Sequence, residues 1–238
     1  MAVILIMTVL SAILLPALNK GRTRSQAISC LNNLRQLQLS WQMFPDDNSG
    51  QLPANDFVDG IKFGSAQTYN GDSWCPGNTR IDFTSANIER GQLFEYNRSA
   101  AIYHCPSDNS KVELPTGSDP VLRTRSYSMS SAINSQVSSF PAFRKQGEMQ
   151  NQNPARLFVF IDTHEDSISD AHFAVDPNGK RWINMPSVRH GRAGNLSFAD
   201  GHIERWNWLA DKKFTGWYQD AEGLDGDDLQ RLQSVVRK

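Results

Sequence analysis

The chain has 238 residues and a formal net charge of −1, with 24 Lys and Arg residues against 25 Asp and Glu residues. This balance leaves no basic footprint, so we expect no nucleic-acid partner. The residues beyond the first 44 are numerous enough for one globular domain with its own core, and the 16 Gly and 11 Pro residues predict that this head is rich in loops.

Residues 1–18, MAVILIMTVLSAILLPAL, are mostly apolar and carry no charge. As a helix they would reach about 27 Å, close to the ~30 Å hydrocarbon core of a bilayer. A cleaved signal peptide usually has cations before its apolar segment and small residues at its cleavage site, and neither feature is present here. We therefore expect residues 1–18 to span a membrane; a cleaved signal peptide and a buried core helix are the alternatives.

Residues 19–44 are expected to continue the same helix as an amphipathic half. Apolar side chains recur there at helical spacing, while the opposite face is polar. Neither Pro16 nor Gly21 is expected to end the helix. Pro45 and the turn-forming residues after it are expected to end it. The pattern predicts one helix of about 44 residues, roughly 66 Å long.

Residues 45–238 are expected to form the head, with an α+β fold of three or four antiparallel strands packed on the N-terminal helix. The expected elements are a short helix at 85–95, strands at 125–129 and 157–162, a hairpin of 195–199 with 202–208, and a final helix at 227–236. Asp200-Gly201 predicts a two-residue type I′ turn in the hairpin, with both central residues at positive φ.

Several segments carry a resemblance to a known family. They are ILLPALNKGRTRSQAISCLNNLRQLQLSWQMFPDDNSGQLPAN near the N-terminus, WCPGN at 74–78, GQLFEYNRSAAIYHCPSD at 91–108, RSYSM at 125–129 and LFVFIDTHEDSISDAHFAVD at 157–176. The last feature is a signature of His190, nine residues, and then Asp200-Gly201. In these features the chain resembles type II secretion pseudopilins, which are type IV pilin-like proteins, of the kind found in the Planctomycetes–Verrucomicrobia–Lentisphaerae bacteria.

The resemblance implies a structural subunit of a periplasmic fibre that assembles through its N-terminal helix. The implied partners are other pseudopilin subunits, the inner-membrane platform of the secretion system, and a prepilin peptidase that removes a leader and methylates the new terminus. The implied location is the inner membrane, with one span and a periplasmic head, and then the fibre or cell surface. The alternative function is a membrane-tethered head that never polymerises and binds a carbohydrate or Ca²⁺.

The family's processing signal is a basic leader ending in Gly, followed by Phe-Thr-Leu-Ile-Glu. By its Pro16 this chain begins about six residues inside that mature helix, so we expect either a start codon assigned too late or a truncated chain. The cations Lys20, Arg22 and Arg24 follow the apolar segment, and by themselves they would hold that end of the span in the cytoplasm. In the family, the basic leader competes with these cations for orientation, and the head faces the periplasm.

The three cysteines are Cys30, Cys75 and Cys105. Cys30 and Cys105 lie in the segments that most resemble the family, so the resemblance favours a disulfide between them. A Cys75–Cys105 bridge and the absence of any disulfide stay open, because spacing does not determine pairing. No CxxC pair is present, and cysteine-bound structural zinc is therefore not expected.

The richest set of polar side chains runs from Asp162 to His202. Asp162, His164, Asp166 and Asp200 are candidate metal ligands, with Ca²⁺ as the metal favoured by oxygen ligands and a transition metal as the alternative. No defined ligand spacing is present, and turn capping by these residues is the simpler interpretation. His190 is expected to hydrogen-bond to the hairpin and set its register. No catalytic motif is found, so no enzyme activity is expected.

Overall fold

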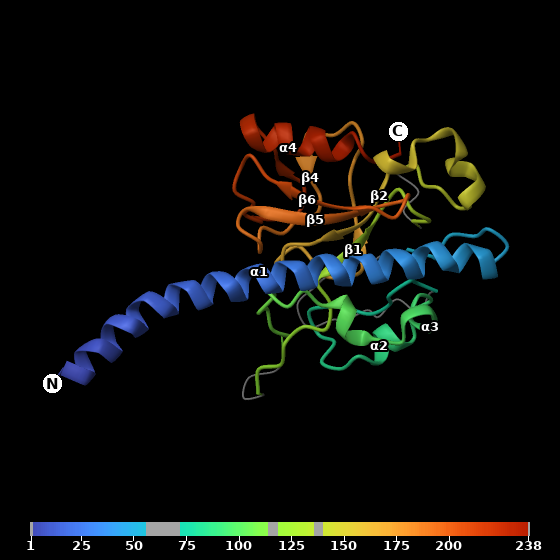
Figure 1. Ribbon diagram of the computed structural model, residues 1–238. Coiled ribbons are helices and arrows are strands. Elements are labelled where there is room, and N and C mark those ends of the chain that lie inside the picture. Colours follow the sequence, from blue (N-terminus) through green and yellow to red (C-terminus); the bar gives the residue numbers. More distant parts are fainter. Residues whose placement is uncertain (1, 56–71, 114–118, 136–139, 238) are drawn as a thin grey trace.

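The computed structural model describes residues 2–55, 72–113, 119–135 and 140–237, and in α1 it describes side chains from Lys20 onward together with Leu15 and Leu18. Its fold is α+β, as the sequence predicts. One long helix, α1 (Ala2–Asp47), extends from the head at its N-terminal end and lies across a sheet at its C-terminal end (Figure 1).

The main sheet has five strands in the order β3-β1-β2-β5-β6. Their bounds are β1 (Tyr127–Ser130), β2 (Phe158–Asp162), β3 (His172–Phe173), β5 (Ala193–Phe198) and β6 (Ile203–Asn207). The sheet is mixed, because β1 pairs in parallel with β3 while the other pairs are antiparallel. The expectation of three or four purely antiparallel strands is wrong in this respect, since a strand of two residues carries too little pattern to be predicted.

A second sheet pairs β4 (Arg181–Trp182) with β7 (Gln219–Asp220). The remaining helices are short, except α4 (Gly223–Gln233), which lies on the side of the sheet away from α1 (Figure 1). The short ones are α2 (Ala86–Glu89), α3 (Phe94–Asn97), η1 (Ala100–Tyr103), η2 (Gln146–Asn151) and η3 (Pro154–Arg156).

Helix α1 passes through Pro45 and ends two residues later, so the prediction that Pro45 stops the helix is wrong. Proline loses its own N–H, but its carbonyl still accepts, and the backbone N–H groups of Asn48 and Gly50 both donate to it at 3.2 and 2.8 Å. The chain then leaves the helix through Ser49 and Gly50, both at positive φ.

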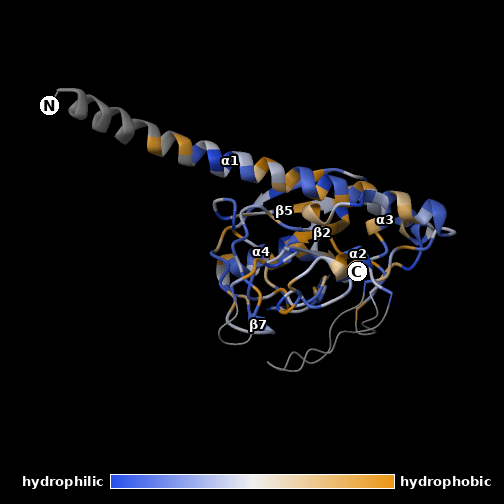
Figure 2. Ribbon diagram, turned by 90° about the horizontal axis from the view of Figure 1, so that it is seen from below, coloured by the Kyte–Doolittle hydropathy of each residue, from blue (hydrophilic) through white to orange (hydrophobic). Residues whose placement is uncertain are grey.

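Hydrophobic and hydrophilic residues alternate along the coloured part of α1 (Figure 2). The buried face of its second half begins at Cys30 and continues with Leu34, Leu37, Trp41 and Phe44. These side chains enter one core with the inner faces of β2 and β5, which confirms the predicted amphipathic half.

The expected helix at 85–95 is two short helices, α2 and α3. Gly91 separates them: a Cβ there would lie 2.3 Å from the Trp74 carbonyl oxygen, and Gln92 N–H donates to Ser73 at 2.9 Å. Helical hydrogen bonding is interrupted because the backbone pairs with this neighbouring segment instead. The final helix, α4, starts four residues before the predicted one and buries Leu229 and Leu232 as expected.

The predicted hairpin is present as β5 and β6, but its turn is not type I′. Gly201 has a φ of 98°, whereas Asp200 does not have positive φ. Gly201 N–H donates to Phe198 at 2.9 Å, and Phe198 N–H donates to His202 at 3.0 Å. This is a three-residue loop with one left-handed glycine, which needs only one residue at positive φ.

Within the described part of the chain, no helix combines the length and the apolar character needed to cross a membrane. The expected span at residues 1–18 lies, apart from Leu15 and Leu18, outside the residues whose side chains the structure describes.

Candidate metal centre

Four buried side chains meet where α1 crosses the sheet: Cys30, Cys105, Asp162 and His190. One ligating atom from each lies within 4.8 Å of the other three. Cys105 Sγ is 3.4 Å from His190 Nε2, and Asp162 Oδ2 is 3.8 Å from the same nitrogen and 3.9 Å from Cys30 Sγ. We call these four residues the CCDH cluster.

Each member of the CCDH cluster comes from a different segment. Cys30 is the first buried residue in the part of α1 whose side chains are described, and Asp162 is the last residue of β2. Cys105 follows η1, where its backbone N–H donates to the Ser126 hydroxyl at 3.1 Å. His190 lies in the tight turn before β5, next to Gly191 with a φ of 69°. The cluster is therefore made by tertiary packing and not by a local motif.

Polar donors surround the Cys30 sulfur. The Tyr127 hydroxyl donates to Cys30 Sγ at 3.1 Å, and the Asn195 side-chain amide donates to the same atom at 3.1 Å. Tyr127 and Asn195 are both buried, on β1 and β5. Two donors on one sulfur favour a thiolate over a neutral thiol.

The pKa values of the two cysteines move in opposite directions. Burial opposes ionisation of Cys30, but hydrogen bonds from Cys105, His190 and Tyr127 bring its pKa well below the ordinary value. The pKa of Cys105 is raised, first by its hydrogen bond to Cys30 and then by burial. Burial also raises the pKa of Asp162 well above that of an ordinary carboxyl, although Arg189 opposes this.

Arg189 links the CCDH cluster to the acidic side chains around it. Its guanidinium lies 2.5 Å from Asp162 Oδ1, 3.0 Å from Asp108 Oδ2 and 3.1 Å from Glu165 Oε2. Burial alone would lower the pKa of Arg189, but these carboxylates, Asp162 first, raise it. Because Arg189 takes the Oδ1 oxygen of Asp162, the Oδ2 oxygen faces the cysteines.

Of the four metal ligands predicted from the sequence, only Asp162 belongs to the CCDH cluster. His164 accepts from the Asp166 backbone N–H at 3.1 Å, and the Asp166 carboxylate is exposed. Asp200 lies in the hairpin turn, 2.5 Å from His202 Nδ1. His164 and Asp200 therefore accept hydrogen bonds from backbone N–H groups in turns, which agrees with the simpler interpretation of the sequence, and the Asp166 side chain stays exposed.

The two disulfides considered from the sequence are not formed, since Cys30, Cys75 and Cys105 are all free and buried. The structure does bring Cys30 and Cys105 together, as the family resemblance implied. Cys75 lies elsewhere, where its sulfur accepts from Arg125 at 3.1 Å and its carbonyl from the same guanidinium at 2.8 Å. Arg125 also pairs with Asp82 at 2.7 Å.

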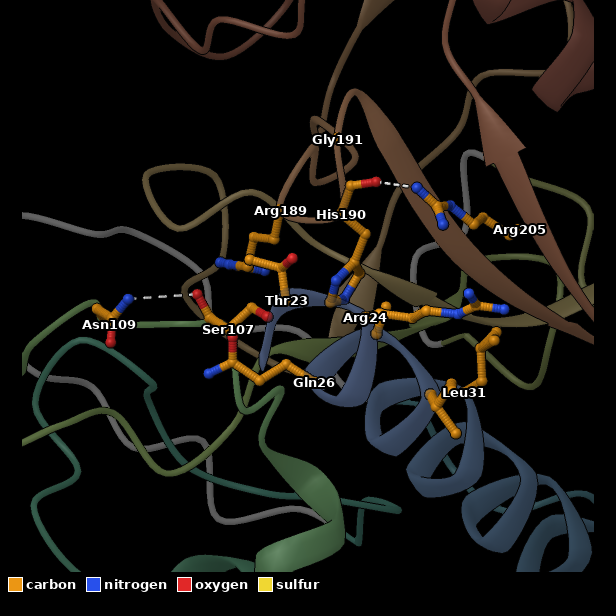
Figure 3. A pocket seen from close by; sticks show the side chains of 12 residues that line it. Thr23, Arg24, Gln26, Leu31, Ser107, Asn109, Arg189, His190, Gly191 and Arg205 are labelled. Carbon is orange, nitrogen blue, oxygen red and sulfur yellow. Dashed lines mark hydrogen bonds between the residues drawn. The ribbon is translucent and has the colours of Figure 1, made fainter. Parts of the chain in front are cut away.

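The His190–Asp200–Gly201 signature brackets β5. The His190 ring enters the CCDH cluster, and its backbone carbonyl accepts from Arg205 of β6 (Figure 3). The expected bond from His190 to the hairpin is thus present, but it uses the backbone and leaves the ring for the cysteines. At the other end, Gly201 lies against Gln42 of α1.

A cavity of about 840 Å³ lies beside the CCDH cluster, between α1 and the loops at 107–109 and 189–191. Arg24 and Thr23 of α1 face His190 and Arg189 across it (Figure 3). His190 thus lines the cavity as well as the cluster.

Sequence reasoning did not identify Cys30, Cys105 and His190 as ligands of one site. The gaps between the four residues along the chain are long, whereas zinc motifs are recognised by short gaps within one loop or helix. The residue types were the available signal, because cysteine and histidine are common zinc ligands, but the sequence suggested a disulfide for the cysteines and a structural role for His190. In comparisons with protein-family models, with curated proteins and with solved structures, nothing matches this chain.

Proposed function

We propose that this chain is a structural pseudopilin subunit of a type II secretion-like periplasmic fibre, related to type IV pili, and that it assembles through α1. The observation that carries the proposal is the form of α1. It is one continuous helix of 46 residues, or about 69 Å. The side chains of residues 20–25 are exposed, and among the described side chains the buried face begins only at Cys30.

An uncharged stripe on the outer face of α1 supports this role. At about 100° per residue, Leu18, Ile28, Leu39 and Met43 fall within an arc of about 80°, opposite the face that packs on the head. All four are more than half exposed. Between Leu18 and Met43 the other residues of the arc are uncharged as well: Gly21, Ser25, Asn32 and Gln36. The stripe ends at Asp46 in the last turn of α1, which also falls in the arc and is exposed. We propose that α1 of a neighbouring copy covers this stripe in the fibre.

The proposed location follows from the pseudopilin role. Before assembly, the apolar segment 1–18 would hold the subunit in the inner membrane with its head in the periplasm. Prepilin peptidase and the inner-membrane platform of the secretion system are the proposed partners. The proposed role is structural and includes no catalysed reaction.

Processing of the gene product tests the pathway. The full gene would be expressed in cells that contain prepilin peptidase, followed by intact mass measurement and N-terminal sequencing. Removal of a leader and methylation of the new terminus are expected. An unprocessed and permanently anchored product would contradict the fibre proposal.

Substitutions on the stripe test assembly itself. Leu39→Glu places a charge on the stripe and is expected to abolish recovery of sheared fibres, while the head keeps its thermal stability. Arg35→Glu is the matched control, because Arg35 is an exposed residue of the same helix outside the arc. Equal assembly by both variants would exclude the stripe as the contact between subunits.

The alternative is a membrane-tethered binding head that does not polymerise. The cavity beside His190 is the observation in its favour, because Arg24 and Arg205 line it and suit an anionic group. An unprocessed product that stays monomeric would favour this function.

A further inference from the structure

We propose that Cys30 Sγ, Cys105 Sγ, Asp162 Oδ2 and His190 Nε2 bind one Zn²⁺ in a closed, structural site. The proposal rests on the geometry of the CCDH cluster and is independent of fibre assembly. The proposal names a specific ion and four ligands, of which only Asp162 was predicted as a metal ligand from the sequence.

The spacing of the ligating atoms fits tetrahedral zinc. Zn–S bonds of about 2.3 Å and Zn–N or Zn–O bonds of about 2.1 Å place neighbouring ligands of a tetrahedron about 3.4–3.8 Å apart. The three measured separations are 3.4, 3.8 and 3.9 Å. The other three separations are at most 4.8 Å, so movements on the order of 1 Å or less would bring all four atoms to these distances.

The chemistry of the ligands selects the metal. Two sulfurs and an imidazole nitrogen are soft or intermediate ligands that favour zinc, whereas Ca²⁺ requires six to eight oxygen ligands. Only Asp162 offers a carboxylate to the cluster, so the Ca²⁺ considered from the sequence does not fit these residues. Four protein ligands fill a tetrahedral coordination sphere, which leaves no open position for substrate and indicates a structural site.

The surrounding residues hold the ligands in a binding arrangement. Arg189 occupies Asp162 Oδ1 at 2.5 Å and so orients Oδ2 toward the cluster. Tyr127 and Asn195 stabilise negative charge on the Cys30 sulfur, and Arg205 holds the backbone carbonyl of His190. Such outer contacts typically orient the ligands of metal sites in proteins.

A divalent cation would also offset the negative charge that the ligands carry when they bind it. Two thiolates and a carboxylate in a buried space would repel each other strongly, and burial already penalises each anion. Arg189 is shared with Asp108 and Glu165, and so it offsets only part of this charge. A divalent cation within reach of all three anions would offset most of the remainder.

Bound zinc would link α1 to the head. Among the side chains that the structure describes, Cys30 is the most N-terminal buried one of α1, and the other three ligands belong to the head. Zinc at this point would resist separation of the helix from the sheet where the helix leaves the domain.

The test uses the full chain in detergent, purified with its thiols reduced and stripped of metal by a chelator. Zn²⁺ is then added, and bound metal is counted by elemental analysis and native mass spectrometry. One Zn²⁺ per chain and a raised melting temperature are expected. Co²⁺ replaces Zn²⁺ in a parallel sample, where the intense visible bands of tetrahedral Co²⁺ and a thiolate charge-transfer band are expected.

Isosteric variants assign the site. Cys105→Ser and Asp162→Asn are expected to lose stoichiometric binding, and Cys105→Ser also to weaken the charge-transfer band. Cys75→Ser is the matched control, because Cys75 is equally buried but lies outside the cluster, and it should bind as the wild type does. Circular dichroism of each metal-free variant identifies one that fails to fold, and Co²⁺ spectra of the folded variants then decide the assignment.

Three results would overturn the proposal. One is no bound metal with all three thiols free in the folded chain. Another is equal binding by the Cys105→Ser variant and the wild type. The third is an intact mass lower by two hydrogens after purification without reductant, together with no zinc uptake on reduction, which would make Cys30 and Cys105 a disulfide pair. None of these results bears on processing or fibre assembly, so the two proposals fail separately.

Discussion

His190 Nε2 lies 3.4 Å from Cys105 Sγ, although the two residues are 85 positions apart. This contact places one end of the His190–Asp200–Gly201 signature in the CCDH cluster. The other end, Gly201, lies against Gln42 of α1. Cys30 of α1 belongs to the same cluster, so the signature contacts α1 near Cys30 and at Gln42. These two residues are 12 positions apart, which is about 18 Å along the helix axis.

Asn195→Ala tests the outer contacts of the cluster. The variant removes one donor to Cys30 Sγ without removing a proposed ligand. We expect Zn²⁺ affinity to fall about 10–100-fold, as is typical for such partners, measured by competition with a chromophoric chelator. Asn207→Ala, at an exposed residue of β6, is the control and should bind normally. An unchanged Zn²⁺ affinity in Asn195→Ala would show that Asn195 does not support the metal site.

Gly201→Ala tests the contact of the hairpin turn with α1. Gly201 has a φ of 98°, and an added Cβ would lie 3.1 Å from Gln42 Nε2. We expect a loss of about 1–2 kcal/mol in the free energy of unfolding, because side chains disfavour this backbone conformation. Urea denaturation measures it. Gly147→Ala is the control, since nothing lies near its Cβ and its φ is not positive; a loss as large in this control would refute the explanation.

Lys212→Met tests a buried ion pair beneath α4. Lys212 Nζ lies 2.5 Å from both Asp225 Oδ1 and Asp228 Oδ2, and Asp228 also accepts from the Leu209 backbone N–H. Removing the cation leaves Asp228 buried without its counter-charge, so we expect a loss of about 3–5 kcal/mol. Thermal and urea denaturation measure this loss.

The adjacent and exposed Lys213 supplies the control, because Lys213→Met should change stability by less than about 0.5 kcal/mol. Adding Asp228→Asn to Lys212→Met should restore part of the loss. If the double variant is no more stable than the single one, the unpaired charge is not the cause.

His172 gives the protein an acid-sensitive component of stability. Its side chain is buried and its Nε2 lies 2.9 Å from the Ser135 hydroxyl. Burial lowers the pKa of His172 to about 4. In the unfolded chain a histidine takes up its proton near pH 6.5, so between these values the unfolded state binds more protons and folding stability falls as the pH is lowered.

Over the interval from pH 6.5 to 4, this loss should reach about 3 kcal/mol. Urea denaturation across the interval measures it, and His172→Gln should show a shallower slope than the wild type. Identical slopes in the two proteins would show that His172 does not titrate as proposed.

The sequence alone determined the elements whose signal is local. The spacing of apolar residues from Ala27 to Phe44 gave the buried face of α1, and the apolar segment 157–162 gave β2. Asp200-Gly201 gave the position of the hairpin, although not its turn type, because two types of loop accept a glycine there. Local periodicity is visible in sequence because a helix or strand repeats its burial pattern every few residues.

Only the tertiary structure decided the pairings between distant segments. Nothing local in His172–Phe173 indicates a parallel strand beside β1, and nothing near Gly91 indicates that the Trp74 carbonyl would interrupt a helix there. The CCDH cluster is the clearest case, because its four ligands come from α1, a loop, β2 and a turn. Residue types reveal which chemistry is available, but the meeting of four side chains depends on how the whole chain packs, and that packing is a property of no single segment.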